Sequence, residues 1–255
     1  MTATEIAILG LSGMIAGIMN SAAGGGTFVA FPALIFLGIS PIQANATATI
    51  ATWPGTISTL IAYREELKDQ YAKIPKLAIL STIGGAIGST VLLFISNKFF
   101  SDLVPYLLLI ATLFFTARPT INRWIQSNKS IQAHTFLYVG SLQILFILIC
   151  IYGGFFGAGM GIMLLAIFGL MGMQNMHQMN ALRSVIGACT NTITIIIFIV
   201  AGLVHWPQAI VMGVGTMLGG YTSARYFRRL SPEWMRKAVI IIAWAMTIYF
   251  FVRSS

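Results

Sequence analysis

The stretch from Asn20 to Thr27, Asn-Ser-Ala-Ala-Gly-Gly-Gly-Thr, decides the fold of this chain. It lies inside an uncharged run that extends from Glu5 to Arg64. A helix of about 20 residues crosses a bilayer, so an uncharged run of this length must fold back inside a membrane. Glycine lets the backbone leave helical geometry, and residues 28–37 would then form a half-helix of about 15 Å. The stretch therefore predicts a helical hairpin whose second arm crosses only half of a membrane.

Composition places the whole chain in a membrane. Of its 255 residues, 57% are apolar and only 8% are charged, and the mean hydropathy is +0.86. A soluble domain carries about 25% charged residues, so a soluble globule is excluded. An outer-membrane barrel alternates apolar and polar residues, whereas these segments are apolar on all sides. We therefore predict an all-α polytopic membrane protein.

The net charge of +9 comes from basic residues that cluster in short connections. The basic connections are 63–76, 118–135 and 225–237, whereas 96–102 and 204–207 carry little charge. Basic loops of membrane proteins face the cytoplasm, which explains the charge without nucleic acid, and no base-stacking pattern accompanies it. We expect a multi-pass protein of the cell membrane with these three loops in the cytoplasm.

The sequence contains an internal duplication. Sliding it by 135 residues aligns clusters of glycine and asparagine in one ungapped register. The aligned segments are Ala23–Gly26 with Ala158–Gly161, Gln43–Ala46 with Gln178–Ala181, Gly84–Gly85 with Gly219–Gly220, and Thr59, Thr112, Phe115 and Arg118 with Thr194, Thr247, Phe250 and Arg253. We predict two repeats, 1–120 and 136–255, joined by a cytoplasmic linker over 121–135.

Equivalent loops of the two repeats carry opposite charge patterns. The basic loop 225–237 corresponds to the charge-poor 96–102, and the basic loop 63–76 corresponds to the charge-poor 198–211. Equivalent loops therefore face opposite sides, which is the pattern of an inverted repeat and is typical of transporters. Counting the crossings makes each repeat a glycine-broken hairpin plus three transmembrane helices, with the N- and C-termini outside.

The second repeat has its own glycine break, at Gly157, Gly159 and Gly161 before residues 162–171. A helix N-terminus carries about half a positive charge and suits an anion. Two such N-termini from inverted repeats would meet near the middle of the membrane. At the other glycines of the apolar segments we expect tight helix packing, namely at Gly84, Gly85, Gly88, Gly213, Gly215, Gly219 and Gly220.

The helices after the two hairpins add polar groups at the same level. Residues four apart share a helix face, which pairs Asn45 with Thr49 and Asn180 with Ser184. Arg183 lies one turn inside a long apolar segment, where it either lines a functional site or extends to the membrane interface. The expected substrate-binding residues are Asn20, Ser21, Gly24, Gly25, Gly26, Thr27, Asn45, Thr49, Gly159, Met160, Gly161, Asn180, Arg183 and Ser184.

Deeper in the predicted helix that contains Arg183, we expect the polar side chains to bond the backbone of that helix. These side chains belong to Thr190, Asn191 and Thr194.

The sequence has no signature of catalysis, of a metal site or of a cofactor. Hydrolase, zinc-protease and phosphate-binding motifs do not occur, and all six acidic residues fall in loops or at segment ends. Cys150 and Cys189 lie in apolar stretches without metal-ligand spacing, so we expect buried thiols. We therefore predict that the protein is not an enzyme and that it binds no cofactor.

Several motifs together resemble the TauE/SafE family, whose members are sulfite and organosulfonate exporters. They are Gly13-x₃-Gly17, then Ala23–Phe28 with Pro32, then Gly38–Pro41 leading into Ala46–Thr49. The resemblance covers the whole chain and implies a small sulfur oxyanion or a sulfonate as substrate. The second repeat departs from the family pattern, because it has Gly159-Met160-Gly161 without a nearby proline, and Leu182-Arg183-Ser184 where Gly-Thr-Ser is usual.

We expect an exporter of a small oxyanion that works by alternating access between the two hairpin tips. A resting membrane drives anions outward by about 2.3 kcal/mol per charge per 100 mV, so export needs no coupling ion. A membrane-embedded enzyme, an anion channel and a scaffold without transport stay open as alternatives. The expected partners are the anion and the lipid bilayer, with the monomer and the homodimer both open.

Overall fold

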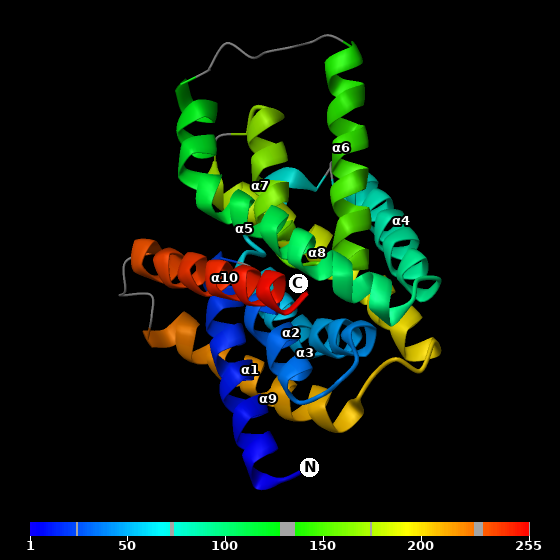
Figure 1. Cartoon of the computed structure of the whole chain (residues 1–255). Helices are drawn as coiled ribbons and strands as arrows, with labels where there is room; N and C mark the ends of the chain where they lie inside the picture. The colour runs from blue at the N-terminus through cyan, green and yellow to red at the C-terminus, as the bar shows by residue number, and fades with distance from the viewer. Residues whose placement is uncertain (24, 72–73, 128–135, 174, 227–231, 255) are drawn as a thin grey trace.

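The computed structural model describes residues 1–23, 25–71, 74–127, 136–173, 175–226 and 232–254. These residues form helices and connections without any strand, so the all-α prediction is confirmed (Figure 1). The helices are α1 (Ala3–Ala23), α2 (Thr27–Phe36), α3 (Pro41–Ala62), α4 (Ile74–Leu93), α5 (Asn97–Ser127), α6 (Phe136–Phe155), α7 (Met160–Leu170), α8 (Met176–Val200), α9 (Trp206–Tyr226) and α10 (Pro232–Ser254), with a 3-10 turn at Lys68–Gln70.

Four helices among the described residues are long and apolar enough to cross a membrane. They are α1, α4, α5 and α8, with candidate spans Ala3–Asn20, Ile74–Leu93, Asn97–Ala117 and His177–Val200. Their outer faces are apolar as well: on α4 the exposed side chains of Ile79, Ile83 and Ile87 follow one another every four residues. Apolar side chains on the outside as well as the inside indicate a surface made for lipid, as in a multi-pass membrane protein.

Two short helices follow the glycine breaks, as the sequence predicts. α2 and α7 each span roughly 15 Å at 1.5 Å per residue, and each ends in the same way. Gly38 and Gly172 adopt left-handed φ angles of 81° and 84°, and the next N–H bonds back to Leu34 and Phe168 respectively. This is a Schellman motif. The first break is shorter than expected, because Asn20 to Ala23 still belong to α1.

Glycines let long helices approach closely. α1 packs along α9, and α4 packs along α6 (Figure 1). A Cβ atom at Gly17 would collide with the backbone oxygen of Thr216, so no larger residue fits there. Tight packing is confirmed at Gly84, Gly85, Gly88, Gly215 and Gly219. The same expectation is wrong for Gly213 and Gly220, where a Cβ would meet nothing closer than 4.0 Å.

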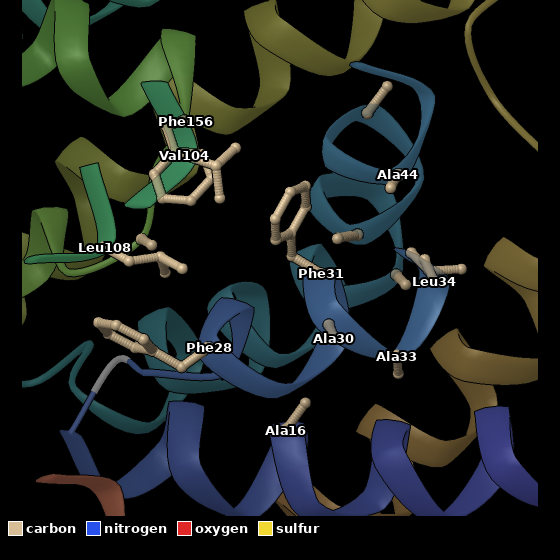
Figure 2. Close-up of a cluster of buried hydrophobic side chains, with 14 of the residues drawn as sticks. Ala16, Phe28, Ala30, Phe31, Ala33, Leu34, Ala44, Val104, Leu108 and Phe156 are labelled. Atoms are coloured by element: carbon tan, nitrogen blue, oxygen red, sulfur yellow. The ribbon is translucent and has the colours of Figure 1, made fainter. Parts of the chain in front are cut away.

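An aromatic core surrounds α2. Phe28 and Phe31 on this helix are fully buried, and Figure 2 shows both rings within a cluster that includes Val104, Leu108 and Phe156. Phe28 packs edge-on against Phe115 of α5, whereas the Phe31 ring packs edge-on against that of Phe156 in the connection between α6 and α7. The half-helix is therefore enclosed by protein rather than by lipid, which a helix that ends inside a membrane requires.

The linker between the predicted repeats is partly helical. α5 continues to Ser127, so residues 121–127 extend that helix. Residues 128–135, the rest of the expected linker, lie outside the described part of the chain.

Candidate functional site

A pocket of about 80 Å³ lies where the two hairpins meet α3 and α8. Its lining combines hydroxyl and amide groups, backbone at the second break, two large apolar side chains and one arginine. The lining residues are Asn20, Thr27, Thr49, Thr52, Thr56, Thr59, Phe156, Gly157, Met160, Gly161, Arg183, Ser184, Gly187 and Asn191. Seven of the residues expected from sequence are among them: Asn20, Thr27, Thr49, Met160, Gly161, Arg183 and Ser184.

The first hairpin contributes two polar side chains. Asn20 lies on the last turn of α1 and Thr27 begins α2. The Asn20 amide sits against α3 at Gly55, where a Cβ atom would come 3.0 Å from its Nδ2. Gly26 does not line the pocket, because a Cβ there would point into α1, 2.7 Å from the backbone oxygen of Ala16.

The other residues expected at this break are placed as follows. Gly25 is buried but does not line the pocket, Ser21 lies in the last turn of α1, and Gly24 lies outside the described residues.

The second hairpin contributes mainly backbone and apolar surface. Gly157 and Gly159 have φ angles of 78° and 77°, which only glycine adopts readily, so they shape the break. Gly159 faces away from the pocket, since a Cβ there would come 2.8 Å from that of Ala111.

The sequence suggests free backbone donors at this break, and the structure corrects this in part. The N–H groups of Met160 and Ile162 bond the carbonyls of Gly157 and Gly159 at 3.3 and 3.0 Å.

Arg183 is the cation of the lining. The residue is only 8% exposed, so its side chain lies inside the protein. Gly161 makes room for it, because a Cβ at that position would stand 3.2 Å from Nη1. A guanidinium stays protonated and offers planar N–H donors. In a low-dielectric interior such a charge favours an anion in the adjacent space.

The predicted polar pairs on α3 and α8 divide between the pocket and the protein frame. Thr49 and Ser184 line the pocket, and each donates its hydroxyl proton to the backbone oxygen four residues earlier, Asn45 and Asn180, at 2.8 Å. Donation to an anion would therefore require these hydroxyls to rotate. Asn45 and Asn180 themselves lie outside the lining.

Asn45 instead ties α3 to the second hairpin. Its Nδ2 donates to the backbone oxygen of Phe155 at 3.0 Å, where α6 ends. Its Oδ1 is buried and has no partner among the described residues. An amide used in this way holds the break in place rather than donating to a ligand, which corrects the role expected for this side chain.

Sequence reasoning missed part of the lining on α3 and α8. Thr52, Thr56 and Thr59 continue the helix face of Thr49, and their spacing was a signal available in the sequence. On α8, the expectation of own-helix bonding is wrong for Thr190, whose hydroxyl donates to Ser81 O at 3.3 Å.

The two other polar residues of that stretch also differ from the expectation. Asn191 lines the pocket, and the buried Thr194 hydroxyl has no partner in the described part of the chain.

The lining as a whole suits a small anion. It offers a buried guanidinium and several neutral hydrogen-bonding groups, and no carboxylate contributes to it. Across the described residues, no group of three or more histidine, cysteine or acidic side chains is arranged to hold a metal ion. The arrangement can bind a charged oxygen-rich ligand, and it contains no nucleophile paired with a base.

Comparisons with known proteins identify relatives over almost the whole chain. A probable membrane transporter protein of Haemophilus influenzae is 28% identical over 243 residues, covering 95% of this chain and 92% of that protein. A probable membrane transporter protein, ORF9, of Sinorhizobium sp is 25% identical, covering 95% and 91%. The probable membrane transporter protein YfcA of Escherichia coli K12 is 26% identical, covering 95% and 88%.

No solved structure matches this chain. The family model described as sulfite exporter TauE/SafE matches residues 9–250, which include both glycine breaks and every residue of the pocket. The family and these relatives are named as transporters rather than as enzymes. The chain therefore belongs to the TauE/SafE family of membrane transporters.

Proposed function

We propose that this protein exports a small oxyanion, such as sulfite or a short organosulfonate, by alternating access at the interface of two inverted repeats. The observation that carries the proposal is the pocket itself, where both hairpins and a buried arginine meet. The family description, sulfite exporter, supports the same chemistry for the substrate.

The order and packing of the helices support the duplication. A shift of 135 residues carries α1 through α5 onto α6 through α10, with each start displaced by only a few residues. The contacts between the two sets come in corresponding pairs. The shift turns the contact of α1 with α9 into a contact of α6 with α4, and both are present. It likewise turns the contact of α3 with α9 into a contact of α8 with α4, and both are present. Reciprocal pairs of this kind are what a two-fold relation between the repeats produces.

A hydrogen bond between equivalent residues supports the same relation. The hydroxyls of Thr112 on α5 and Thr247 on α10 lie 3.0 Å apart, and the two residues are 135 positions apart in sequence. A residue that contacts its own equivalent lies beside the two-fold axis. We infer that this axis passes between α5 and α10.

The pocket lies on the same interface. Three pairs of its lining residues are separated by the shift: Thr49 with Ser184, Thr52 with Gly187, and Thr56 with Asn191. Transporters built from inverted repeats bind substrate at such an interface, where broken helices end. The site is therefore well placed to be exposed to each side in turn.

The pocket extends toward one end of α3, and we infer that this end faces the cytoplasm. Thr59, at the far end of the lining, lies close to the C-terminus of α3, which leads into the basic residues 63–76. Basic loops favour the cytoplasmic side, so the conformation would be open inward, with both termini outside. The membrane potential then drives a bound anion outward without a coupling ion.

The size of the pocket favours a compact anion. Its volume of about 80 Å³ is below the ~150 Å³ of an engineered cavity that holds benzene. An oxyanion with a few oxygens around one sulfur suits this space, and Thr59 marks the end of the lining toward which a tail could extend. We expect affinity to fall as the organic group of a sulfonate becomes larger.

Thermal unfolding of the purified protein tests binding directly. The ligands are sulfite, sulfate, thiosulfate and short organosulfonates, and chloride serves as the reference salt. A ligand of the native state adds about 2.7 kcal/mol of stability at 100 times its dissociation constant. We expect this gain with at least one sulfur oxyanion, and we expect Arg183→Gln to abolish it.

Two further variants separate the role of the arginine from general charge. Arg183→Lys keeps the charge but loses the planar donors, so weakened binding is expected. Lys76→Gln removes an exposed cation at the start of α4 and should bind normally. Equal stabilisation of wild type and folded Arg183→Gln, judged by size-exclusion chromatography, would exclude the pocket as the anion site.

A further inference from the structure

A second cavity, here called the outer cavity, lies at the opposite end of α3 from Thr59. Its volume is about 400 Å³. It is lined by Phe31, Ile35, Gly38, Ile39, Ser40, Pro41, Ser101, Asp102, Val104 and Phe250. Several of these residues belong to the connection between α2 and α3 and to the second turn of α5. The outer cavity is thus partly polar and lies near the end of the bundle where α3 begins.

Two phenylalanine rings stand between the pocket and the outer cavity. Phe156 lines the pocket and Phe31 lines the outer cavity, and their centroids are 5.5 Å apart in an edge-on contact. Figure 2 shows the Phe31 ring directed from α2 toward Phe156 and Val104. Phe100 packs against both rings, with centroids at 6.4 and 6.1 Å. The contact between Phe31 and Phe156 therefore joins the linings of the two cavities, and Phe100 packs beside it.

We propose that the outer cavity is the outer half of the transport path and that Phe31 and Phe156 form the gate between it and the pocket. This inference rests on the proposed function for its purpose, although the gate itself can be tested without a substrate. Both rings are almost completely buried, at 0% and 1% exposure. Apolar rings in contact exclude water and ions, so they close the path in this conformation.

The gate joins elements that the two repeats supply separately. Phe31 and Phe100 belong to α2 and α5 of the first repeat, whereas Phe156 lies in the break between α6 and α7 of the second. Rocking of one repeat against the other would separate these rings without breaking a covalent or hydrogen-bonded link between them. The movement that opens the outer cavity would therefore act directly on this contact.

The positions in the opposite repeats that are equivalent to Phe31 and Phe156 carry no aromatic residue. The shift of 135 residues places Ala166 at the equivalent of Phe31 and Ser21 at the equivalent of Phe156. Small residues cannot form the same seal, which agrees with a pocket that extends to Thr59 on that side. The aromatic gate therefore lies on one side of the pocket only.

Side-specific cysteine labelling tests the gate. The reporter is Thr56→Cys, a position in the pocket, in a background with Cys150→Ala and Cys189→Ala. A membrane-impermeant thiol reagent is added to one side or the other of vesicles of known orientation. While Phe31 and Phe156 are intact, the reporter should react much more slowly from the side of the outer cavity than from the side of the basic loops, because the gate opens only in the outward-facing state. Phe31→Ala or Phe156→Ala should raise the rate from the outer side toward the rate from the other side.

A matched control is available on the same half-helix. Phe28 is also fully buried and packs edge-on at 5.3 Å against Phe115, but it lines neither cavity. Phe28→Ala should therefore leave the labelling rate from the outer side as low as in wild type. Fast labelling of this control from the outer side would mean general loosening of the core and would overturn the gate.

Milder variants keep the test decisive if the alanine variants fail to fold. Phe31→Leu and Phe156→Leu retain apolar bulk but lose the ring contact, so their labelling rate from the outer side should lie between those of wild type and the alanine variants. An outer-side labelling rate that stays at the wild-type level in all folded variants overturns the proposal. The readout needs no substrate, so a gate that opens in a protein that binds no anion would reject the proposed function alone.

Discussion

The two broken hairpins reach one pocket, but they bring different chemistry to it. The first brings the Asn20 amide and the Thr27 hydroxyl, whereas the second brings the Phe156 ring and a stretch of backbone. The cation of the lining, Arg183, follows the second hairpin, and the shift of 135 residues places Ala48 at its equivalent. Similar helix lengths thus bring unlike groups to the pocket lining, with hydrogen-bonding side chains from the first hairpin and an aromatic ring with backbone from the second.

The backbones of the two breaks differ as well. Gly26, which precedes α2, has an ordinary helical φ of −58°, whereas Gly159, which precedes α7, has a φ of 77°. The first glycine is required by the closeness of α1, and the second by its own backbone conformation. The comparison shows that two glycines that each stand directly before a half-helix can be needed for different physical reasons.

Substitution of Gly159 by alanine should have the largest effect on stability. A left-handed conformation costs a non-glycine residue about 1–2 kcal/mol, and the added Cβ would lie 2.8 Å from that of Ala111. Overpacking of this kind typically adds ~1–3 kcal/mol. Gly26→Ala meets only the second penalty, so it should lower the thermal unfolding midpoint by less than Gly159→Ala does.

Gly140→Ala is the control for this pair. Gly140 lies within α6, and a Cβ there would meet nothing within 4 Å. Alanine in a helix interior is about 0.5–1 kcal/mol better than glycine, so this variant should be unchanged or slightly more stable. A Gly159→Ala protein as stable as Gly140→Ala would remove the distinction drawn between the two breaks.

The sequence predicts these hairpins well because their signals are local. Glycines within a long apolar run indicate a break, and the length of apolar sequence that follows gives the half-helix directly, as α2 and α7 show. The ends of the helices are predicted only to within a few residues. The first break was expected to begin at Asn20, whereas α1 continues to Ala23. Helix propensity decides such an end together with packing, and only the first is visible in the sequence.

The site is less predictable because it depends on which helices become neighbours. The spacing of Asn45 and Thr49 places them on one face, but it cannot tell that the amide of Asn45 bonds the backbone of Phe155. In the same way, Thr190 bonds Ser81, a partner on α4 that is far away in sequence. Buried polar groups take whichever partner the tertiary structure offers, so their roles follow from the fold.

The contact between Thr112 and Thr247 gives a prediction of intermediate size. Thr247 donates its proton to Ala243 O at 2.7 Å, so Thr112 is the donor in the bond between the two hydroxyls. Thr112→Val and Thr247→Val should each cost about 1 kcal/mol of stability. In the double variant the second change should cost less than it does alone, because the shared bond is already lost.

Thr222→Val supplies the additive reference for that cycle. The Thr222 hydroxyl on α9 bonds its own helix, at the backbone oxygen of Leu218. Combined with Thr112→Val, its effect should simply add, as measured by thermal unfolding. Full additivity between Thr112→Val and Thr247→Val would show that the contact between equivalent residues contributes nothing, and it would weaken the case for an axis at this point.

The smallest effect on stability is expected at an exposed ion pair, in contrast to the buried Arg183 of the pocket. In the connection after α3, the ammonium of Lys68 bonds Glu65 and lowers the pKa of that carboxyl. A lowered pKa stabilises the folded protein at neutral pH, and this contribution disappears as the pH falls through the folded-state pKa. Both side chains are largely exposed, so water and salt screen the pair. Glu65→Gln should therefore leave the unfolding midpoint at neutral pH unchanged within error in 0.15 M salt, where screening acts within about 8 Å. A clear loss of stability that persists at high salt would show that this connection is held more rigidly than its exposure indicates.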